Sequence, residues 1–90
     1  MRATYKRPMM RGIALLDEHG PADWRERINP YTLDIQSGHN CVLGQLYGVY
    51  SRGADALGFD IEDGGDYGFA TRFNYRMLNK RWKEELARSA

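Results

Sequence analysis

The sequence predicts an all-α protein, a small single-domain bundle of about four helices with a central helix starting near residue 40. Apolar residues recur at the 3.6-residue helical period in several segments, and glycine and proline separate those segments. The alternation typical of a strand covers only residues 31–35. Ninety residues suffice for one domain, which we place at residues 8–88 after a flexible basic arm at residues 1–7.

Two short helices are expected at the start of the domain. Pro8 suits a first helical turn, where its missing N–H is not needed, and Gly20-Pro21 ends that helix. Trp24 and Ile28 then lie four residues apart, so a second helix can bury both side chains. Residues 31–35 have no evident partner strand, and we interpret them as an extended or 3₁₀ connector with its leucine and isoleucine turned inward.

The central segment, 41–58, carries an apolar face at helical spacing. The residues expected on this buried face are Leu43, Leu46, Tyr47, Tyr50, Ala54 and Leu57. Asn40 is a suitable N-cap. Gly44 and Gly48 form a smooth ridge that indicates close packing of another backbone, because glycine inside a helix is otherwise unfavourable. Gly53 leaves open whether the segment is one helix or two.

The stretch at 59–68 is acidic and rich in glycine, and we expect a solvated loop. It does not match a calcium-binding EF-hand loop: counting from Asp60, position 12 is Thr71 rather than glutamate. The last helix is expected at 71–88. Its core face is formed by Tyr75, Leu78, Trp82 and Leu86.

The same last helix carries the candidate binding residues. Phe73 and Met77 lie nearly opposite its core face, with Phe69 placed beside them. A basic stripe follows one flank and consists of Arg72, Arg76, Lys80 and Lys83. A helix that is apolar on two sides either sits deep or offers its second side to a partner. We therefore expect these residues to bind another macromolecule.

The net charge of +1 hides an uneven distribution. Residues 1–12 carry +4, residues 13–70 carry −7 and residues 71–90 carry +4. The basic ends either fold back on the acidic middle, belong to ordinary solvated faces, or meet in one basic patch for nucleic acid or an acidic protein. The near-neutral total counts against nucleic acid, because domains that bind it are usually clearly basic.

Nothing in the sequence indicates catalysis, a metal or a membrane. Cys41 is the only cysteine, so no internal disulfide can form, and we expect a buried thiol. His19, His39 and Cys41 are too few for a structural zinc site. Nucleotide-binding and hydrolase motifs are absent, and no apolar run approaches the about 20 residues that cross a bilayer. We expect a soluble cytoplasmic protein that is not an enzyme and needs no cofactor.

Several segments carry a resemblance to a known group of proteins. They are Cys41-Val42-Leu43-Gly44-Gln45-Leu46-Tyr47-Gly48 above all, together with Ala56-Leu57-Gly58, Leu15-Leu16-Asp17, Trp24-Arg25-Glu26-Arg27-Ile28, Thr32-Leu33-Asp34 and the ending around Trp82. In these segments the chain resembles small uncharacterised proteins of actinobacterial bacteriophages. The resemblance implies a phage accessory protein that acts in the cytoplasm of a bacterial host.

The leading hypothesis is therefore a non-enzymatic phage accessory protein that binds a host or phage protein through Phe73, Met77 and the basic stripe. The alternative is a nucleic-acid-binding accessory protein that uses the basic N-terminal arm and the last helix. A homodimer built on Gly44 and Gly48 is compatible with either hypothesis.

Overall fold

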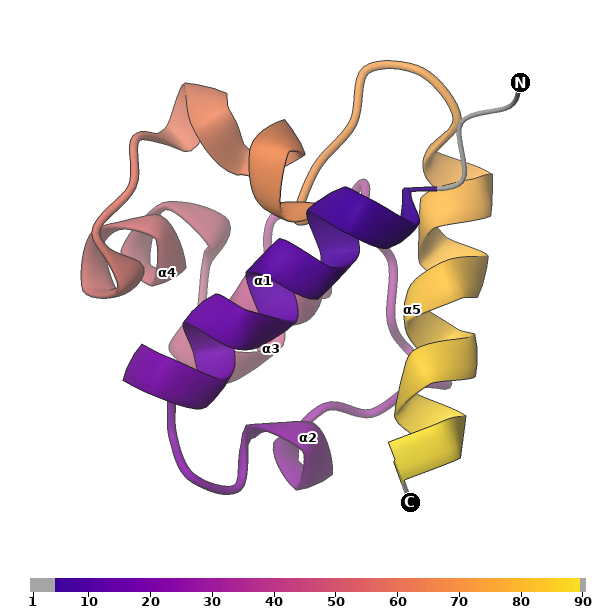
Figure 1. Cartoon of the computed structure of the whole chain (residues 1–90), viewed down its shortest axis with the longest axis horizontal. Helices are drawn as coiled ribbons and strands as arrows, with labels where there is room; N and C mark the ends of the chain where they lie inside the picture. The colour runs from indigo at the N-terminus through magenta and orange to yellow at the C-terminus, as the bar shows by residue number, and fades with distance from the viewer. Residues whose placement is uncertain (1–4, 90) are drawn as a thin grey trace.

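Helices are the only regular secondary structure in residues 5–89, the part of the chain that the computed structural model describes (Figure 1). In chain order the elements are α1 (Lys6–His19), α2 (Trp24–Arg27), α3 (Val42–Tyr47), α4 (Tyr50–Leu57), the 3₁₀ helix η1 (Ile61–Tyr67) and α5 (Tyr75–Ser89). The all-α fold class is confirmed. The helices are more numerous than the four expected, and every α-helix except α1 is shorter than predicted.

The two longest helices, α1 and α5, frame the core. Figure 1 shows α1 crossing the molecule in front of α3, with α5 along one side and α4 and η1 toward the other. Lys6 and Arg7, which we assigned to the N-terminal arm, form the first turn of α1. The rest of that expected arm, residues 1–4, lies outside the described residues.

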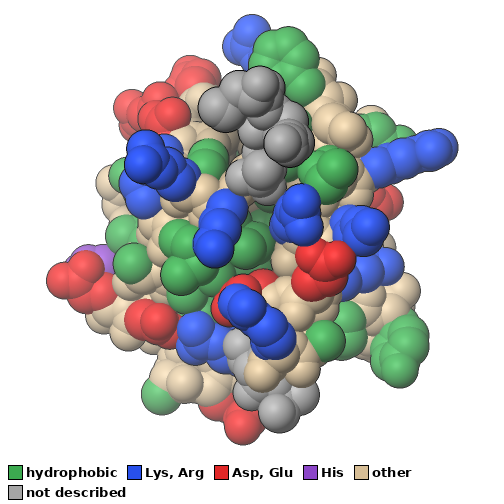
Figure 2. Space-filling model, turned by 45° about the vertical axis from the view of Figure 1, so that its right-hand side comes forward, with side chains coloured by type: hydrophobic (Ala, Val, Ile, Leu, Met, Phe, Trp, Pro, Cys, Tyr) green, Lys and Arg blue, Asp and Glu red, His purple; other side chains and the backbone are tan. Residues whose placement is uncertain are grey.

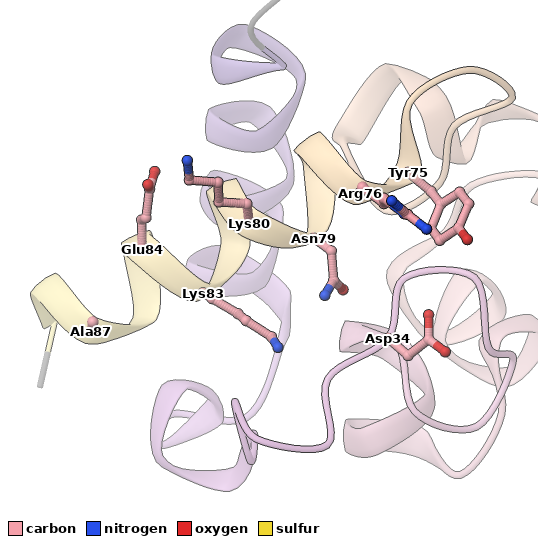
Figure 3. Close-up of a pocket in the computed structure, with 8 residues that line it drawn as sticks. All are labelled: Asp34, Tyr75, Arg76, Asn79, Lys80, Lys83, Glu84 and Ala87. Carbon is pink, nitrogen blue, oxygen red and sulfur yellow. The ribbon is translucent and has the colours of Figure 1, made fainter.

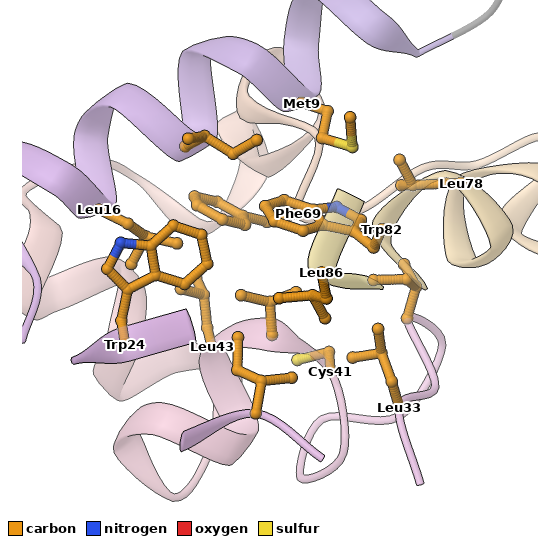
Figure 4. Close-up of a cluster of buried hydrophobic side chains, with 14 of the residues drawn as sticks. Met9, Leu16, Trp24, Leu33, Cys41, Leu43, Phe69, Leu78, Trp82 and Leu86 are labelled. Carbon is orange, nitrogen blue, oxygen red and sulfur yellow. The ribbon is translucent and has the colours of Figure 1, made fainter. Parts of the chain in front are cut away.

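Aromatic rings occupy the middle of the core (Figure 4). Trp82 of α5 is fully buried, stacks on Phe69 at 5.9 Å between ring centroids, and meets Trp24 edge-on at 6.4 Å. Phe69 stacks in turn on Phe59 at 5.7 Å. Trp82 Nε1 donates a hydrogen bond of 2.7 Å to the carbonyl oxygen of Gly68, so the polar atom of this ring is satisfied inside the core. The last helix thus supplies the centre of the core.

Asp17 of α1 links α1 to α2. Its Oδ1 accepts hydrogen bonds of 2.9 Å from Arg25 Nη1 and from Trp24 Nε1. These two donors hold the pKa of the Asp17 carboxyl below its ordinary value. Trp24 and Ile28 are both buried, as their spacing predicted, although α2 itself is a single turn.

The central segment forms two helices. Gly48 ends α3 with a φ of 94°, a conformation that favours glycine, Val49 is extended, and α4 begins at Tyr50. The helical period restarts at this break, so the expected face is divided. Buried are Leu43, Ala54 and Leu57; only partly buried are Leu46, Tyr47 and Tyr50.

The cap of α3 is Cys41, and the prediction that Asn40 is the N-cap is wrong. Cys41 Sγ accepts a hydrogen bond of 3.3 Å from the backbone N–H of Gly44, three residues later. The side chain of Asn40 is one residue too far from Gly44 to make this bond. Gly44 packs on the chain's own backbone, since an added Cβ would lie 2.5 Å from the carbonyl oxygen of Gly38. The close approach of another backbone that the sequence indicated is therefore present at Gly44 but not at Gly48, where an added Cβ would meet no atom within 4 Å.

The stretch at 59–68 is more ordered than the loop we predicted, because most of it forms η1. Its four carboxylates are exposed, as expected: Asp60, Glu62, Asp63 and Asp66. Gly64 explains the ordered structure, because the hydroxyl of Tyr50 occupies the space that a Cβ would fill. That hydroxyl donates a hydrogen bond of 3.0 Å to the carbonyl oxygen of Ile61 and so fixes η1 on α4.

Candidate functional site

The segment that leads into α5 is not helical, so Arg72 and Phe73 do not lie on the helix as predicted. The helix begins at Tyr75, directly after Asn74. The Oδ1 of Asn74 accepts a hydrogen bond of 3.0 Å from the backbone N–H of Met77, which is the bond that an N-cap side chain makes. The helical periodicity that placed residues 71–74 on a face therefore does not apply to them.

Phe73 is instead presented by a hydrogen-bonded turn. Its backbone N–H donates to Thr71 Oγ1 at 3.2 Å, and the N–H of Asn74 donates to the hydroxyl of Tyr5 at 3.1 Å. The Tyr5 hydroxyl also lies 3.2 Å from Thr71 Oγ1. The ring of Phe73 is thus 87% exposed on a backbone that is fixed from both sides. A fixed, exposed aromatic ring loses little conformational freedom when a partner covers it.

The apolar part of the candidate surface is smaller than expected. Phe69, which we placed beside Phe73, is buried against Trp82 and belongs to the core. Met77 is partly buried. Phe73 and the exposed part of Met77 remain as the apolar contact area.

Three members of the basic stripe lie together along α5. Arg76, Lys80 and Lys83 line a groove of about 460 Å³, which we call the α5 groove. Asp34, on the connector before α3, also lines it. Figure 3 shows Lys83 pointing to the side of α5 on which Asp34 lies and Lys80 pointing to the other side. Arg72, the fourth member, lines a different hollow that also borders Phe73.

The basic stripe is not neutralised by acidic side chains. Within residues 5–89, an ion pair of 3.2 Å or less engages Arg25, Arg27, Arg81 and Arg88. No ion pair or hydrogen bond to a side chain is found there for the four stripe residues Arg72, Arg76, Lys80 and Lys83. Unneutralised positive charges in a row attract anionic groups, and the effect is strongest at low ionic strength.

The start of α1 and the end of α5 border one groove, but its lining is not the single basic patch that one of the charge interpretations expected. A second groove, of about 700 Å³, lies between the start of α1 and the end of α5. It is lined by Lys6, Met9, Met10, Arg81, Glu84, Glu85, Ala87 and Arg88. Figure 2 shows lysine and arginine side chains gathered on this side of the molecule with acidic side chains among them. The surface is therefore mixed in charge.

Cys41 and the histidines lie in separate environments. Cys41 is 1% exposed, and burial raises the pKa of its thiol, which keeps it protonated and unreactive at neutral pH. His39 Nδ1 lies 2.9 Å from the carbonyl oxygen of Gly48. Among the described residues no group of three or more His, Cys, Asp or Glu side chains is placed to hold a metal ion. The prediction that the protein is not an enzyme stays a prediction.

The sequence did not identify Asp34 and Asn79 as residues of the α5 groove. Asn79 Oδ1 accepts a hydrogen bond of 2.9 Å from the N–H of Ile35, and its Nδ2 donates one of 3.2 Å to the carbonyl oxygen of Leu33. The side-chain amide of Asn79 thereby holds the connector to α5 on both sides of Asp34. Asparagine is a weak helix former, so its position inside a predicted helix was the one sign in the sequence that the side chain of Asn79 makes a specific contact.

Comparisons with models of protein families, with curated proteins and with solved structures found no match to this chain. Within residues 5–89, the helices are too short or too polar to span a bilayer.

Proposed function

We propose that this chain is a non-enzymatic phage accessory protein that binds a host or phage protein in the cytoplasm of a bacterial host. The binding surface consists of Phe73, the exposed part of Met77 and the basic stripe. The observation that carries the proposal is the unneutralised stripe next to an exposed ring on a fixed turn. The phage and host setting rests only on the resemblance of segments such as 41–48.

The chemistry of the surface defines what the partner has to offer. Aromatic and arginine side chains are favoured in protein interfaces, where they contribute much of the binding energy. A partner would place an apolar side chain on Phe73 and carboxylates along the stripe. Arg76 and Lys83 are seven residues apart on α5, which is about 10 Å at the helical rise of 1.5 Å per residue. About two turns of an acidic helix, or a few extended residues, would cover that length.

Affinity capture from a nuclease-treated lysate of an actinobacterial host tests the proposal. The wild type is compared with Phe73→Asp, with Phe73→Asp/Met77→Asp, and with Tyr31→Asp as a matched control, because Tyr31 is 93% exposed on a different segment. We expect the wild type and the Tyr31 variant to retain one protein that both Phe73 variants lose and that elutes as salt is raised.

Enrichment of the same proteins by all four chains would contradict the proposal. Phe73 is exposed, so Phe73→Asp alone is expected to leave the free energy of unfolding within about 0.5 kcal/mol of the wild type. A thermal melt of each variant separates a lost contact from a lost fold.

A nucleic-acid-binding accessory protein is the second candidate, favoured by the meeting of the two basic ends around one groove. Each phosphate contact releases counterions, so binding would weaken steeply with salt. Replacement of all four stripe residues by glutamine is expected to abolish it: Arg72, Arg76, Lys80 and Lys83. The absence of a gel shift with single- or double-stranded DNA at low salt would remove this candidate.

Sedimentation at several concentrations reports whether the chain forms a homodimer.

A further inference from the structure

We propose that Asp34 is a specificity-determining residue of the α5 groove. Because of Asp34, the groove prefers a protein segment of mixed charge to a polyanion such as nucleic acid. Such a segment offers carboxylates to the basic stripe and one cation to Asp34. This inference rests on the proposed function, because it names the chemistry of the partner at the same surface.

Hydrogen bonds hold the backbone at Asp34 and one oxygen of its carboxylate. Its N–H donates to the carbonyl oxygen of Asn40 at 3.0 Å, and its Oδ1 accepts from the N–H of Gln36 at 3.0 Å. The side-chain amide of Asn79 binds the backbone of both residues that flank Asp34. The backbone at Asp34 therefore has little freedom to move away from α5. Figure 3 shows Asp34 on the connector, across the groove from Asn79 and Lys83.

The charges that line the groove are asymmetric. Arg76, Lys80 and Lys83 stand on α5, and Asp34 is a fixed negative charge on the facing connector. Glu84, the other carboxylate of the groove, is engaged by Arg81 at 3.2 Å. The uncompensated charges that line the groove are thus three cations on α5 and one carboxylate on the connector.

A polyanion and a mixed-charge segment respond differently to this arrangement. A strand of phosphates along the three cations brings negative groups next to Asp34, where like charges repel. A protein segment can instead place a lysine or arginine against Asp34 while its carboxylates contact the stripe. Selectivity that depends on repelling the wrong ligand needs such a fixed like charge in the binding site.

Binding of a fluorescein-labelled oligothymidylate to the full chain at low salt tests the role of Asp34. The test variant is Asp34→Asn, whose side-chain oxygen can still accept the hydrogen bond from Gln36. The matched control is Asp55→Asn, which changes the net charge by the same amount at an exposed site of α4 outside the groove. We expect Asp34→Asn to bind the oligonucleotide about three- to tenfold more tightly than the wild type, because one close like charge is removed.

The control variant is expected to stay within about twofold of the wild type, since surface charges at a distance are screened. In a Lys80→Gln/Lys83→Gln background the same Asp34→Asn change should give a smaller gain than in the wild type, which would locate the effect in the α5 groove. Equal affinities for Asp34→Asn and Asp55→Asn would overturn the proposal, and so would a failure of Asp34→Asn to bind at all.

The two proposals fail separately. A chain that captures a protein through Phe73 but shows no contrast between the two aspartate variants loses only the role of Asp34. A chain that shows the contrast but captures no protein loses the proposed function and with it the mixed-charge partner.

Discussion

Trp82 joins two aromatic rings from different parts of the chain. Its ring contacts Phe69 on one side and Trp24 on the other, and its N–H is paired with the carbonyl oxygen of Gly68. A large ring with a satisfied polar atom combines the burial of apolar area with a fixed orientation. Trp82 therefore holds α2 and the segment after η1 against α5.

Replacing Trp82 by phenylalanine tests this role. The variant leaves the carbonyl oxygen of Gly68 without its donor and leaves a cavity where the second ring was. Together these are expected to lower the free energy of unfolding by about 2–4 kcal/mol. Urea denaturation measures the change, with Tyr31→Ala as the control, because Tyr31 is exposed and should cost less than about 0.5 kcal/mol. Similar costs for the two variants would show that the core does not depend on Trp82.

Among the elements, α3 and the turn before it are joined by a close backbone contact at Gly44. Gly44 lies so close to residues 38–39 that an added Cβ would be 2.5 Å from the carbonyl carbon of His39. Backbone cannot move aside as a flexible side chain can. The N-terminus of α3 and the connector are therefore fixed together at this glycine.

Gly44→Ala is expected to destabilise the protein by about 1–3 kcal/mol, the usual range for overpacking. Gly65→Ala is the matched control. Its Cβ would meet no atom closer than 3.7 Å, and its φ is not positive, so the change should be neutral or slightly stabilising. Thermal unfolding of both variants gives the comparison. A Gly65 variant that loses as much stability as the Gly44 variant would contradict the close approach at α3.

The first and last helices could be predicted from the sequence, whereas η1, the break between α3 and α4, and the ends of the elements could not. Leu78, Trp82 and Leu86 are buried as their spacing predicted, because periodicity over a long helix averages out local exceptions. The predicted start of α5 was wrong. The helix begins where the side chain of Asn74 caps it, and such a local hydrogen bond competes with the helix propensity of the preceding residues.

The candidate site shows the same division. The neighbourhood of Arg76, Lys80 and Lys83 follows from helical spacing alone. Asp34 joins them only through contacts between segments more than 40 residues apart in the chain, because Asn79 binds on either side of it. A single sequence contains no periodic signal for such a contact.

For the molecule as a whole, three buried or partly buried acidic groups predict how stability depends on pH. Burial raises the pKa of the Cys41 thiol above its ordinary value of 9.0, and it raises the pKa of Tyr47 and of Tyr50 above 10.0. All three groups are neutral when protonated. The folded chain therefore holds these protons more tightly than the unfolded chain does.

This difference stabilises the fold fully below the ordinary pKa values and is lost as pH rises through the raised ones. The unfolded chain begins to release its thiol proton near pH 9 and its tyrosine protons near pH 10, while the folded chain keeps them. Ionised Tyr50 could also no longer donate its hydrogen bond to the carbonyl oxygen of Ile61. We expect the urea midpoint to change little through the thiol and tyrosine groups between pH 7 and 8 and to fall from about pH 9 upward.

Cys41→Ala separates the thiol from the tyrosines in this pH dependence. The substitution removes the group with the lowest of the three ordinary values, so the variant's midpoint should begin to fall about one pH unit later than that of the wild type. The onset of the fall is the quantity to compare, because loss of the Cys41 cap lowers the variant's stability at every pH. A midpoint that stays level or rises between pH 8.5 and 10 in the wild type would mean that these groups are as solvated in the folded protein as in the unfolded chain.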